Sequence, residues 1–117
     1  MKFLLLIYND PAKLEAIKGE QFNAEMRDCL AHADQLRAGG CLLDTQMLED
    51  PDQAKSVRMR NGRLVATDGP FAETKEQLGG FILIEARDLN DAIQVAGKIP
   101  LARLGSIEVR PIKELRP

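Results

Sequence analysis

The chain has 117 residues and a formal net charge of -2, and hydrophobic residues make up 44% of it. This length suits one domain spanning 1–117, and this hydrophobic content is typical of a packed core, which excludes a disordered protein. The balanced charge and the 4% aromatic content argue against nucleic acid or an anionic membrane as a general partner.

The first predicted element is a strand over 2–8, a continuous apolar run that ends at Asn9-Asp10-Pro11. Such a run is typical of a central strand covered on both faces. It is too short to span a bilayer and lacks the length and cleavage site of a signal peptide, so we expect a cytoplasmic protein.

A helical pattern follows over 12–38. Its apolar stripe recurs at helical spacing and consists of Phe22, Met26, Cys29, Leu30, Ala33 and Leu36. Gly19 is expected to interrupt or restart this helix, and Gly39-Gly40 to end it. We interpret Cys29 and Cys41 as two buried thiols rather than a disulfide or a redox pair. With no CxxC motif and one histidine, we assign no metal and no cofactor.

The middle of the chain predicts a strand over 41–48 and then a hairpin. Asn61-Gly62 lies between two extended runs, and both residues tolerate the positive φ that a two-residue hairpin turn requires. A polar loop over 68–78 follows. The remaining elements are a strand over 79–85, a helix over 89–98 capped by Asp88, and a strand over 105–110.

This order predicts an α+β fold, a ferredoxin-like βαββαβ layout with an extra hairpin. Two helices can cover only one face of such a sheet. Because the strands at 2–8 and 81–84 are apolar on both sides, we expect a second copy of the chain to cover the other face. A cleft between the two sheets of this homodimer would be a natural pocket for a small molecule.

The loop over 68–78 carries the candidate catalytic residues Asp68, Glu73 and Glu76, with Lys75 as a candidate ligand-binding residue. If 72–78 forms a helical turn, Glu73 and Glu76 share a face and can act as an acid/base couple. The alternative is a solvated loop whose charges pair with each other. Asp68 could instead stabilise the turn by accepting bonds from backbone N–H groups.

Further candidate ligand-binding residues lie outside this loop. Gly79 and Gly80 begin a strand, where glycine often marks the close approach of a ligand or of another backbone. His32 is interpreted as a partly buried or surface histidine, with a functional role as the alternative. Arg58 and Arg60, with Arg63, would share one side of the hairpin, where they either extend into water or receive an anion.

Four parts of the sequence are distinctive together: DGPFAETKEQLGGF at 68–81, the opening strand, the Asn61-Gly62 hairpin and the C-terminal segment 99–111. In these parts the chain resembles the DGPF branch of the YCII-related family. The resemblance implies a dimeric α+β barrel of ferredoxin-like halves. Related enzyme-like proteins are proposed to pair a histidine on the first helix with an aspartate before a proline. These positions fall near Cys29 and at Ile99, so that chemistry does not carry over.

Our leading hypothesis is a homodimer that binds an unidentified small molecule beside the loop over 68–80 and performs cofactor-free proton-transfer or elimination chemistry. The resemblance also suggests a non-catalytic module that partners an extracytoplasmic-function sigma factor, because some family domains occur near or joined to such factors. A third hypothesis is a ligand sensor without chemistry.

Overall fold

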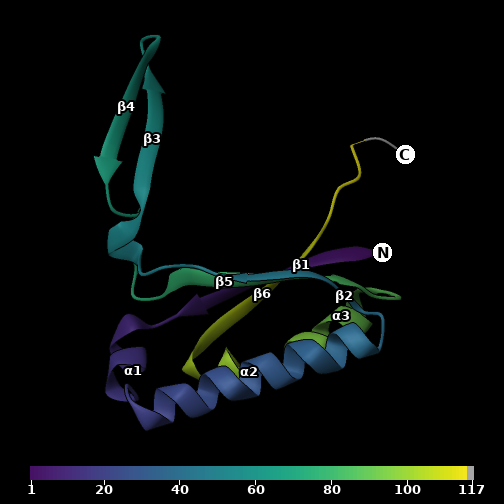
Figure 1. Ribbon diagram of the computed structural model, residues 1–117. Helices are drawn as coiled ribbons and strands as arrows, with labels where there is room; N and C mark the ends of the chain where they lie inside the picture. Colours follow the sequence, from purple (N-terminus) through teal and green to yellow (C-terminus); the bar gives the residue numbers. More distant parts are fainter. Residues whose placement is uncertain (116–117) are drawn as a thin grey trace.

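A four-stranded antiparallel sheet lies on a layer of helices, and a two-stranded hairpin projects from it (Figure 1). The structure, a computed structural model, describes residues 1–115. The strand order is β2-β5-β1-β6, with bounds β1 Lys2–Asn9, β2 Leu42–Met47, β5 Gln77–Glu85 and β6 Gly105–Pro111. The order of elements along the chain is the predicted one.

The helices form where the sequence predicts them. They are α1 (Pro11–Ala16), α2 (Glu20–Ala38) and α3 (Leu89–Ala96), with short 3₁₀ turns η1 (Pro51–Gln53) and η2 (Pro100–Leu104). The predicted interruption is confirmed, because Gly19 precedes α2 with a φ of 87°. The predicted cap is also confirmed, since the Asp88 carboxylate accepts a 2.8 Å bond from the backbone N–H of Asp91.

The predicted hairpin consists of β3 (Lys55–Arg60) and β4 (Arg63–Asp68). Asn61 and Gly62 both have positive φ, 53° and 75°, as the two-residue turn requires. Among residues 1–115, these two strands pair only with each other. The hairpin stands away from the sheet, on the side opposite the helices (Figure 1).

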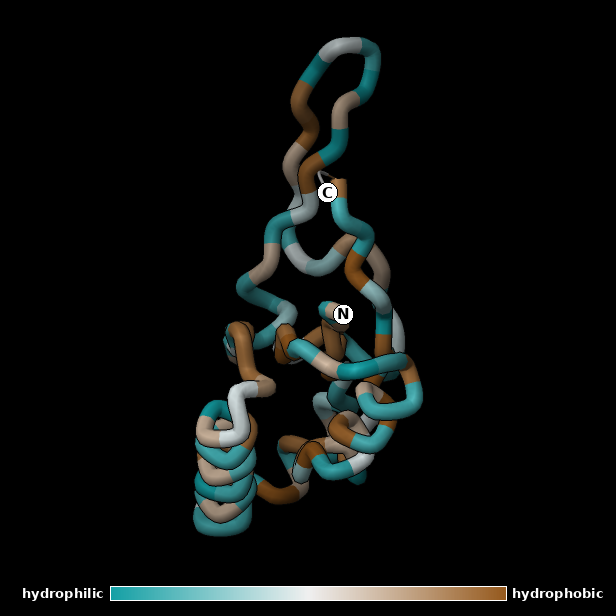
Figure 2. Tube along the Cα trace, turned by 90° about the vertical axis from the view of Figure 1, so that its right-hand side faces the viewer, coloured by the Kyte–Doolittle hydropathy of each residue, from teal (hydrophilic) through white to brown (hydrophobic). Residues whose placement is uncertain are grey.

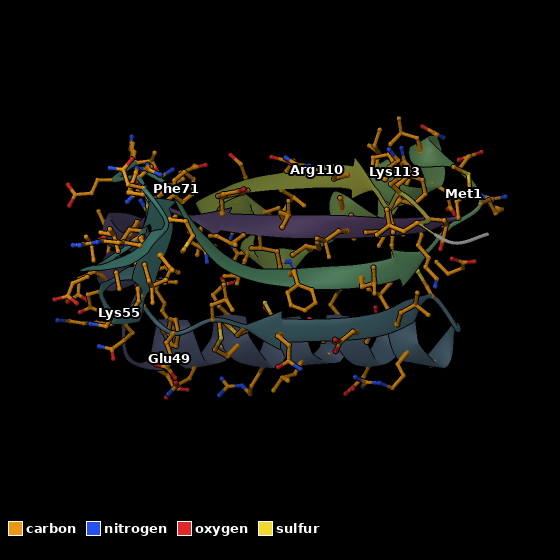
Figure 3. All side chains as sticks on the ribbon, turned by 90° about the horizontal axis from the view of Figure 1, so that it is seen from above. Met1, Glu49, Lys55, Phe71, Arg110 and Lys113 are labelled. Carbon is orange, nitrogen blue, oxygen red and sulfur yellow. The ribbon has the colours of Figure 1, made fainter. Side chains whose placement is uncertain are left out.

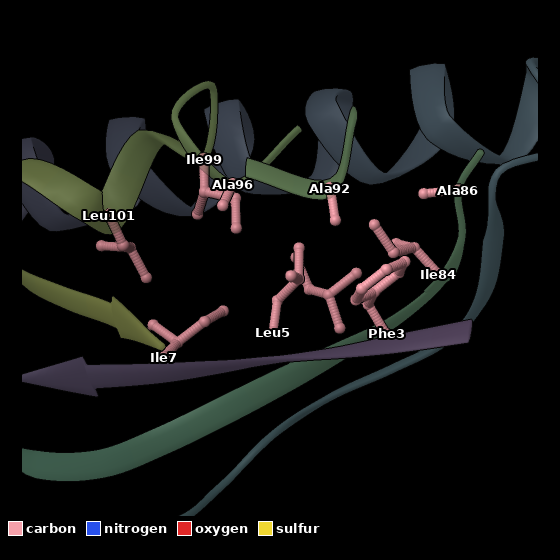
Figure 4. Close-up of a cluster of buried hydrophobic side chains, with 10 residues drawn as sticks. Phe3, Leu5, Ile7, Ile84, Ala86, Ala92, Ala96, Ile99 and Leu101 are labelled. Atoms are coloured by element: carbon pink, nitrogen blue, oxygen red, sulfur yellow. The ribbon is translucent and has the colours of Figure 1, made fainter. Parts of the chain in front are cut away.

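The core lies between the sheet and the helices (Figure 4). Phe3 and Leu5 of β1 and Ile84 of β5 are its largest fully buried side chains. Ala92 and Ala96 of α3 pack over them, and their small side chains allow this helix to approach the strands closely.

The second face of the sheet is also apolar, as predicted. In β1 the side chains between the core residues are Leu4, Leu6 and Tyr8, and they face Leu83, Phe81 and Leu78 of β5. No helix in residues 1–115 covers this face (Figure 1). We call it the open face; Asp44 and Gln46 of β2 and Glu108 and Arg110 of β6 form its polar margins.

The hairpin makes the molecule an extended, L-shaped body. The principal extents are 47 × 46 × 19 Å and the radius of gyration is 16.1 Å, whereas a compact domain of this length would have about 13 Å. Figure 2 shows the hairpin well beyond the sheet in the perpendicular view. Within the described residues, no helix combines the length and the apolar character needed to cross a membrane.

Candidate functional site

A cleft of about 700 Å³ lies where the hairpin leaves the body of the protein. This volume falls within the range of small-molecule pockets, roughly 300–1,000 Å³. We call it the hairpin cleft. It is lined by the base of the hairpin (55–58), the segment 48–54, much of the loop over 70–78, and Tyr8 of β1.

Hydrogen bonds between the hairpin base and the following loop shape one wall of this cleft. The Ser56 hydroxyl donates to the carbonyl of Gly69 at 2.8 Å, and the Arg58 guanidinium donates to the carbonyl of Phe71 at 3.3 Å. Gly69 has a φ of 90° and donates its backbone N–H to Ala54 at 2.8 Å. A glycine is needed there because a side chain is strained at that φ.

Gln77 holds the next part of the loop. Its side-chain amide nitrogen lies 3.3 Å from the carbonyl of Ala72, 3.0 Å from the carbonyl of Thr74 and 3.0 Å from the Thr74 hydroxyl. The Thr74 hydroxyl donates in turn to the carbonyl of Glu76. These bonds close the loop on itself and direct part of it into the cleft.

The loop does not form the helical turn on which the pairing of Glu73 and Glu76 depended. Gly69, Pro70 and the bonds of Gln77 favour an irregular path instead. Glu76 is partly buried and lines the cleft, whereas Glu73 and Lys75 are exposed and do not line it. The structure therefore brings only Glu76 of these three residues to the cleft.

Within residues 1–115, the Asp68 carboxylate does not accept the backbone N–H bonds expected of a turn-stabilising residue. It pairs with the Lys55 ammonium across the base of the hairpin, and both side chains are exposed. Asp68 is not among the cleft residues. Asp68 therefore links β4 to β3 through Lys55. The turn that follows depends on Gly69 instead.

The arginines share one face of the hairpin, as predicted, since Arg60 pairs with Arg63 and Arg58 lies two residues away. Arg58 lines the cleft. Arg60 lies by the exposed tip and donates to the carbonyl of its neighbour Met59 at 3.1 Å. None of the three arginines forms an ion pair within residues 1–115.

A second, much smaller cavity of about 50 Å³ lies on the helical side of the sheet. Here the structure brings together His32, Gly79 and Gly80, with Cys29 of α2 and Asn9 of β1. A water molecule takes up about 30 Å³. The cavity therefore suits one water rather than an organic substrate.

Asn9 is a polar residue of this cavity that sequence reasoning missed. It is 6% exposed, and its Oδ1 atom has no hydrogen-bond partner within the described residues. A buried carbonyl oxygen without a donor is costly, so a water in the cavity would satisfy it. No sequence signal marked Asn9, because an Asn-Asp-Pro run after a strand is typical of a turn.

The electrostatics of the small cavity favour neutral groups. Burial, reinforced by the positive charge of Lys98, lowers the pKa of His32. Burial is also the main reason that the pKa of the Cys29 thiol is raised. His32 is therefore a neutral imidazole at pH 7 and Cys29 a protonated thiol rather than an activated nucleophile.

A second buried polar residue, Glu25, was also missed. Its Oε1 atom pairs with the guanidinium of Arg103, while its buried Oε2 atom has no partner among residues 1–115. The pair joins α2 to η2, the two elements that supply Cys29 and Leu101 to the small cavity.

The two positions that the family resemblance assigns to a catalytic pair meet in this cavity. At these two positions the chain has Cys29 and Ile99 in place of the histidine and the aspartate, and His32 lines the same cavity. The described part of the chain contains no group of three or more His, Cys, Asp or Glu side chains suited to a metal.

Comparison with known proteins confirms the family resemblance. The model of the YCII-related domain matches residues 1–116. An uncharacterised protein of Rhizobium meliloti is 36% identical over 119 residues, which cover 100% of this chain and 96% of that protein.

A solved structure is also similar. It is the 5-chloro-2-hydroxyhydroquinone dehydrochlorinase of Burkholderia phenoliruptrix, in complex with 2,5-dihydroxybenzoquinone, with a TM-score of 0.57 and 16% identity. The match covers 97% of this chain and 94% of that one. At this identity the likeness establishes a shared fold.

Proposed function

The chain belongs to the family of YCII-related domains, and on that premise we propose that it is a homodimer that binds a small organic molecule in the hairpin cleft and performs cofactor-free acid/base chemistry on it. One observation carries this proposal: a cleft of about 700 Å³ in which apolar walls meet the cations of Arg58 and Lys55 and the carboxylates of Glu49, Asp50 and Glu76. Apolar walls with a few convergent polar groups are typical of ligand sites.

The dimer part of the proposal rests on the open face. Each copy is a ferredoxin-like half, and a second copy packed sheet to sheet would bury the leucines and aromatics of that face. Tyr8 and Leu78 lie on the open face and also line the cleft. The partner would therefore form part of the cleft wall, giving a dimeric α+β barrel.

The lining indicates the class of ligand. Leu48, Phe71 and Leu78 supply apolar contact. Arg58 supplies a positive charge that has no ion pair within residues 1–115, whereas the charge of Lys55 is paired with Asp68. The Arg58 guanidinium uses one bond on the carbonyl of Phe71 and has further donors for a carboxylate or phenolate. A small cyclic acid or phenol fits this chemistry, and the dihydroxybenzoquinone in the similar structure supports a ligand of this size.

We assign the proton transfer to Glu76. Of the predicted acid/base residues Asp68, Glu73 and Glu76, it is the one that lines the cleft and is partly shielded from water. A carboxylate within reach of a bound carbon acid or phenol can remove and return its proton.

The test is ligand-induced stabilisation of the full chain, with 2,5-dihydroxybenzoquinone as the first probe and a panel of small aromatic acids and phenols beside it. A ligand that binds the folded state raises the melting temperature. We expect Arg58→Ala to abolish this rise and the matched Arg63→Ala, outside the cleft, to retain it.

A turnover assay on any molecule that binds separates chemistry from binding. We expect Glu76→Gln to keep binding and lose turnover, and Glu73→Gln to keep both. Equal stabilisation of wild type and Arg58→Ala would count against the site. Unchanged turnover in Glu76→Gln would leave a ligand sensor.

The projecting hairpin favours a second candidate, a non-catalytic interaction module whose partner is a sigma factor. An exposed two-stranded element with an apolar face is a common recognition surface. Co-purification with an extracytoplasmic-function sigma factor, lost on removal of 56–67, would support this candidate over the first.

A further inference from the structure

Most of the exposed large apolar side chains gather at two opposite ends of the molecule, the exceptions among residues 1–115 being Leu30 and Ile93. One group lies on the hairpin and at its base: Val57, Met59, Leu64, Val65 and Phe71, with Met47, Leu48 and Leu78 nearby. The other includes Met1, Leu43, Leu89, Ile112 and Leu115. Figure 3 shows the separation, with Phe71 and Lys55 at one end of the sheet and Met1 and Lys113 at the other.

The hairpin has one apolar face from its tip to the Lys55–Asp68 ion pair at its base. The register places Val57 opposite Ala66 and Met59 opposite Leu64, all on the side away from the arginines. Val57, Met59 and Leu64 are 59%, 60% and 68% exposed. An isolated two-stranded hairpin is marginally stable in water, so this face requires a partner surface.

The length of the hairpin shows where that surface would be. Strands of six residues extend about 20 Å, whereas stacked sheets lie about 10 Å apart. If a second copy covers the open face, the hairpin must therefore extend past the partner's sheet. A two-fold axis that runs across the strands brings the hairpin end of each copy to the opposite end of the other.

We propose that the hairpin is a clasp whose apolar face packs against the Met1, Leu43 and Ile112 end of a second copy of this chain. The proposal rests on the dimer part of the proposed function and adds the hairpin as the element that holds it. The apolar group on the hairpin of each copy then packs against the apolar group at the Met1 end of the other copy. The two contacts are equivalent by symmetry.

The charges agree with this orientation. With its apolar face inward, the hairpin directs Arg60 and Arg63 away from the partner contact, while Arg58, nearer the base, lines the cleft. Arginines without ion pairs then stay in water or, for Arg58, in the cleft, and no unpaired charge is buried. The opposite orientation would bury the arginines and leave Met59 and Leu64 exposed.

The experiment measures the dimer dissociation constant of the full chain by sedimentation. We expect Leu64→Ser and Met59→Ser each to raise it at least about tenfold, since each removes a buried apolar side chain from both symmetric contacts. Leu43→Ser, at the other end, should do the same. The matched control is Leu30→Ser, because Leu30 of α2 is 67% exposed and lies outside both groups; its dimer should be unchanged.

A dissociation constant for Leu64→Ser within about twofold of that of Leu30→Ser would overturn the clasp. If Leu6→Ser on the open face nevertheless weakened the dimer of the full chain, the sheet-to-sheet association would stand without the clasp. A wild-type chain that stays monomeric would overturn both, while the Arg58→Ala binding test would still judge the cleft.

Hydrogen exchange of the wild type avoids any folding defect of the variants. Amides at 55–68 should gain protection as the protein concentration rises through the dissociation constant. Protection that is independent of concentration there would also overturn the clasp.

Discussion

The side-chain amide of Asn9 occupies the space in which a Cβ atom on Gly79 would lie. The two residues meet at a β-bulge: Ile7 pairs with Gly80 and Tyr8 with Leu78, so Gly79 is the extra residue. At Gly79 the sequence predicted the close approach of a ligand or of another backbone. In the structure, the group that approaches is the side chain of Asn9. Gly80 has the same role toward the backbone carbonyl of Gln46.

Gly79→Ala is expected to destabilise the protein by about 1–3 kcal/mol, because the new methyl group must displace the buried Asn9 amide. Gly39→Ala is the control. Its Cβ would have no neighbour nearer than 3.5 Å, and we expect a change below about 1 kcal/mol. Urea unfolding of both variants checks this, and equal stabilities would contradict the packing.

Arg103→Ala should destabilise the protein more than Arg27→Ala. Arg103 pairs with the buried Glu25, whereas Arg27 pairs with Glu20 on the surface. Removing Arg103 leaves a buried carboxylate without its partner, which costs about 1–3 kcal/mol. The exposed pair should contribute below about 1 kcal/mol. Denaturant midpoints measure both, and a larger loss in Arg27→Ala would refute the assignment.

His32 should make the stability of the fold sensitive to acid. Because burial lowers the pKa of His32, the unfolded state binds its proton more readily than the folded state. The contribution of His32 to the free energy of unfolding is therefore complete above the unfolded pKa of about 6.5. This contribution declines as the pH falls through that pKa. His32→Gln should lose less stability than wild type between pH 7.5 and pH 5.5, measured by urea unfolding. Identical losses would show that the imidazole titrates freely.

Gln77→Ala should loosen the loop beside the hairpin cleft without unfolding the sheet. Its amide nitrogen contacts three acceptors on Ala72 and Thr74. In the variant these acceptors would form hydrogen bonds with water instead. We expect faster hydrogen exchange confined to 72–76. The control is Gln94→Ala, at an exposed position of α3, which should leave the exchange rates of 72–76 unchanged. Unchanged rates in Gln77→Ala would show that the Gln77 side chain does not hold the loop.

Much of the fold was predictable because its signals are local. Gly19 interrupts the helical segment, Asn61-Gly62 forms the hairpin turn, and Asp88 caps α3, each within a few residues of its effect. The continuous apolar run of β1 likewise predicted a strand with two apolar faces.

The candidate site was less predictable because its parts come from distant segments. Much of the loop over 70–78 lines the cleft, yet composition could not show that Glu76 would line it and Glu73 would not. That difference depends on Gln77 and Gly69, which direct the path of the loop.

By itself, the sequence determined the order of strands and helices, the family and the apolar second face of the sheet, because glycine turns, caps and periodicity act over short stretches of chain. Only the tertiary structure decided that the hairpin projects from the body, that Asn9 and Glu25 become buried, and that His32 meets Cys29 and Ile99 in a cavity. The physical reason is that burial and proximity arise from packing between segments far apart in the chain, which no local pattern records.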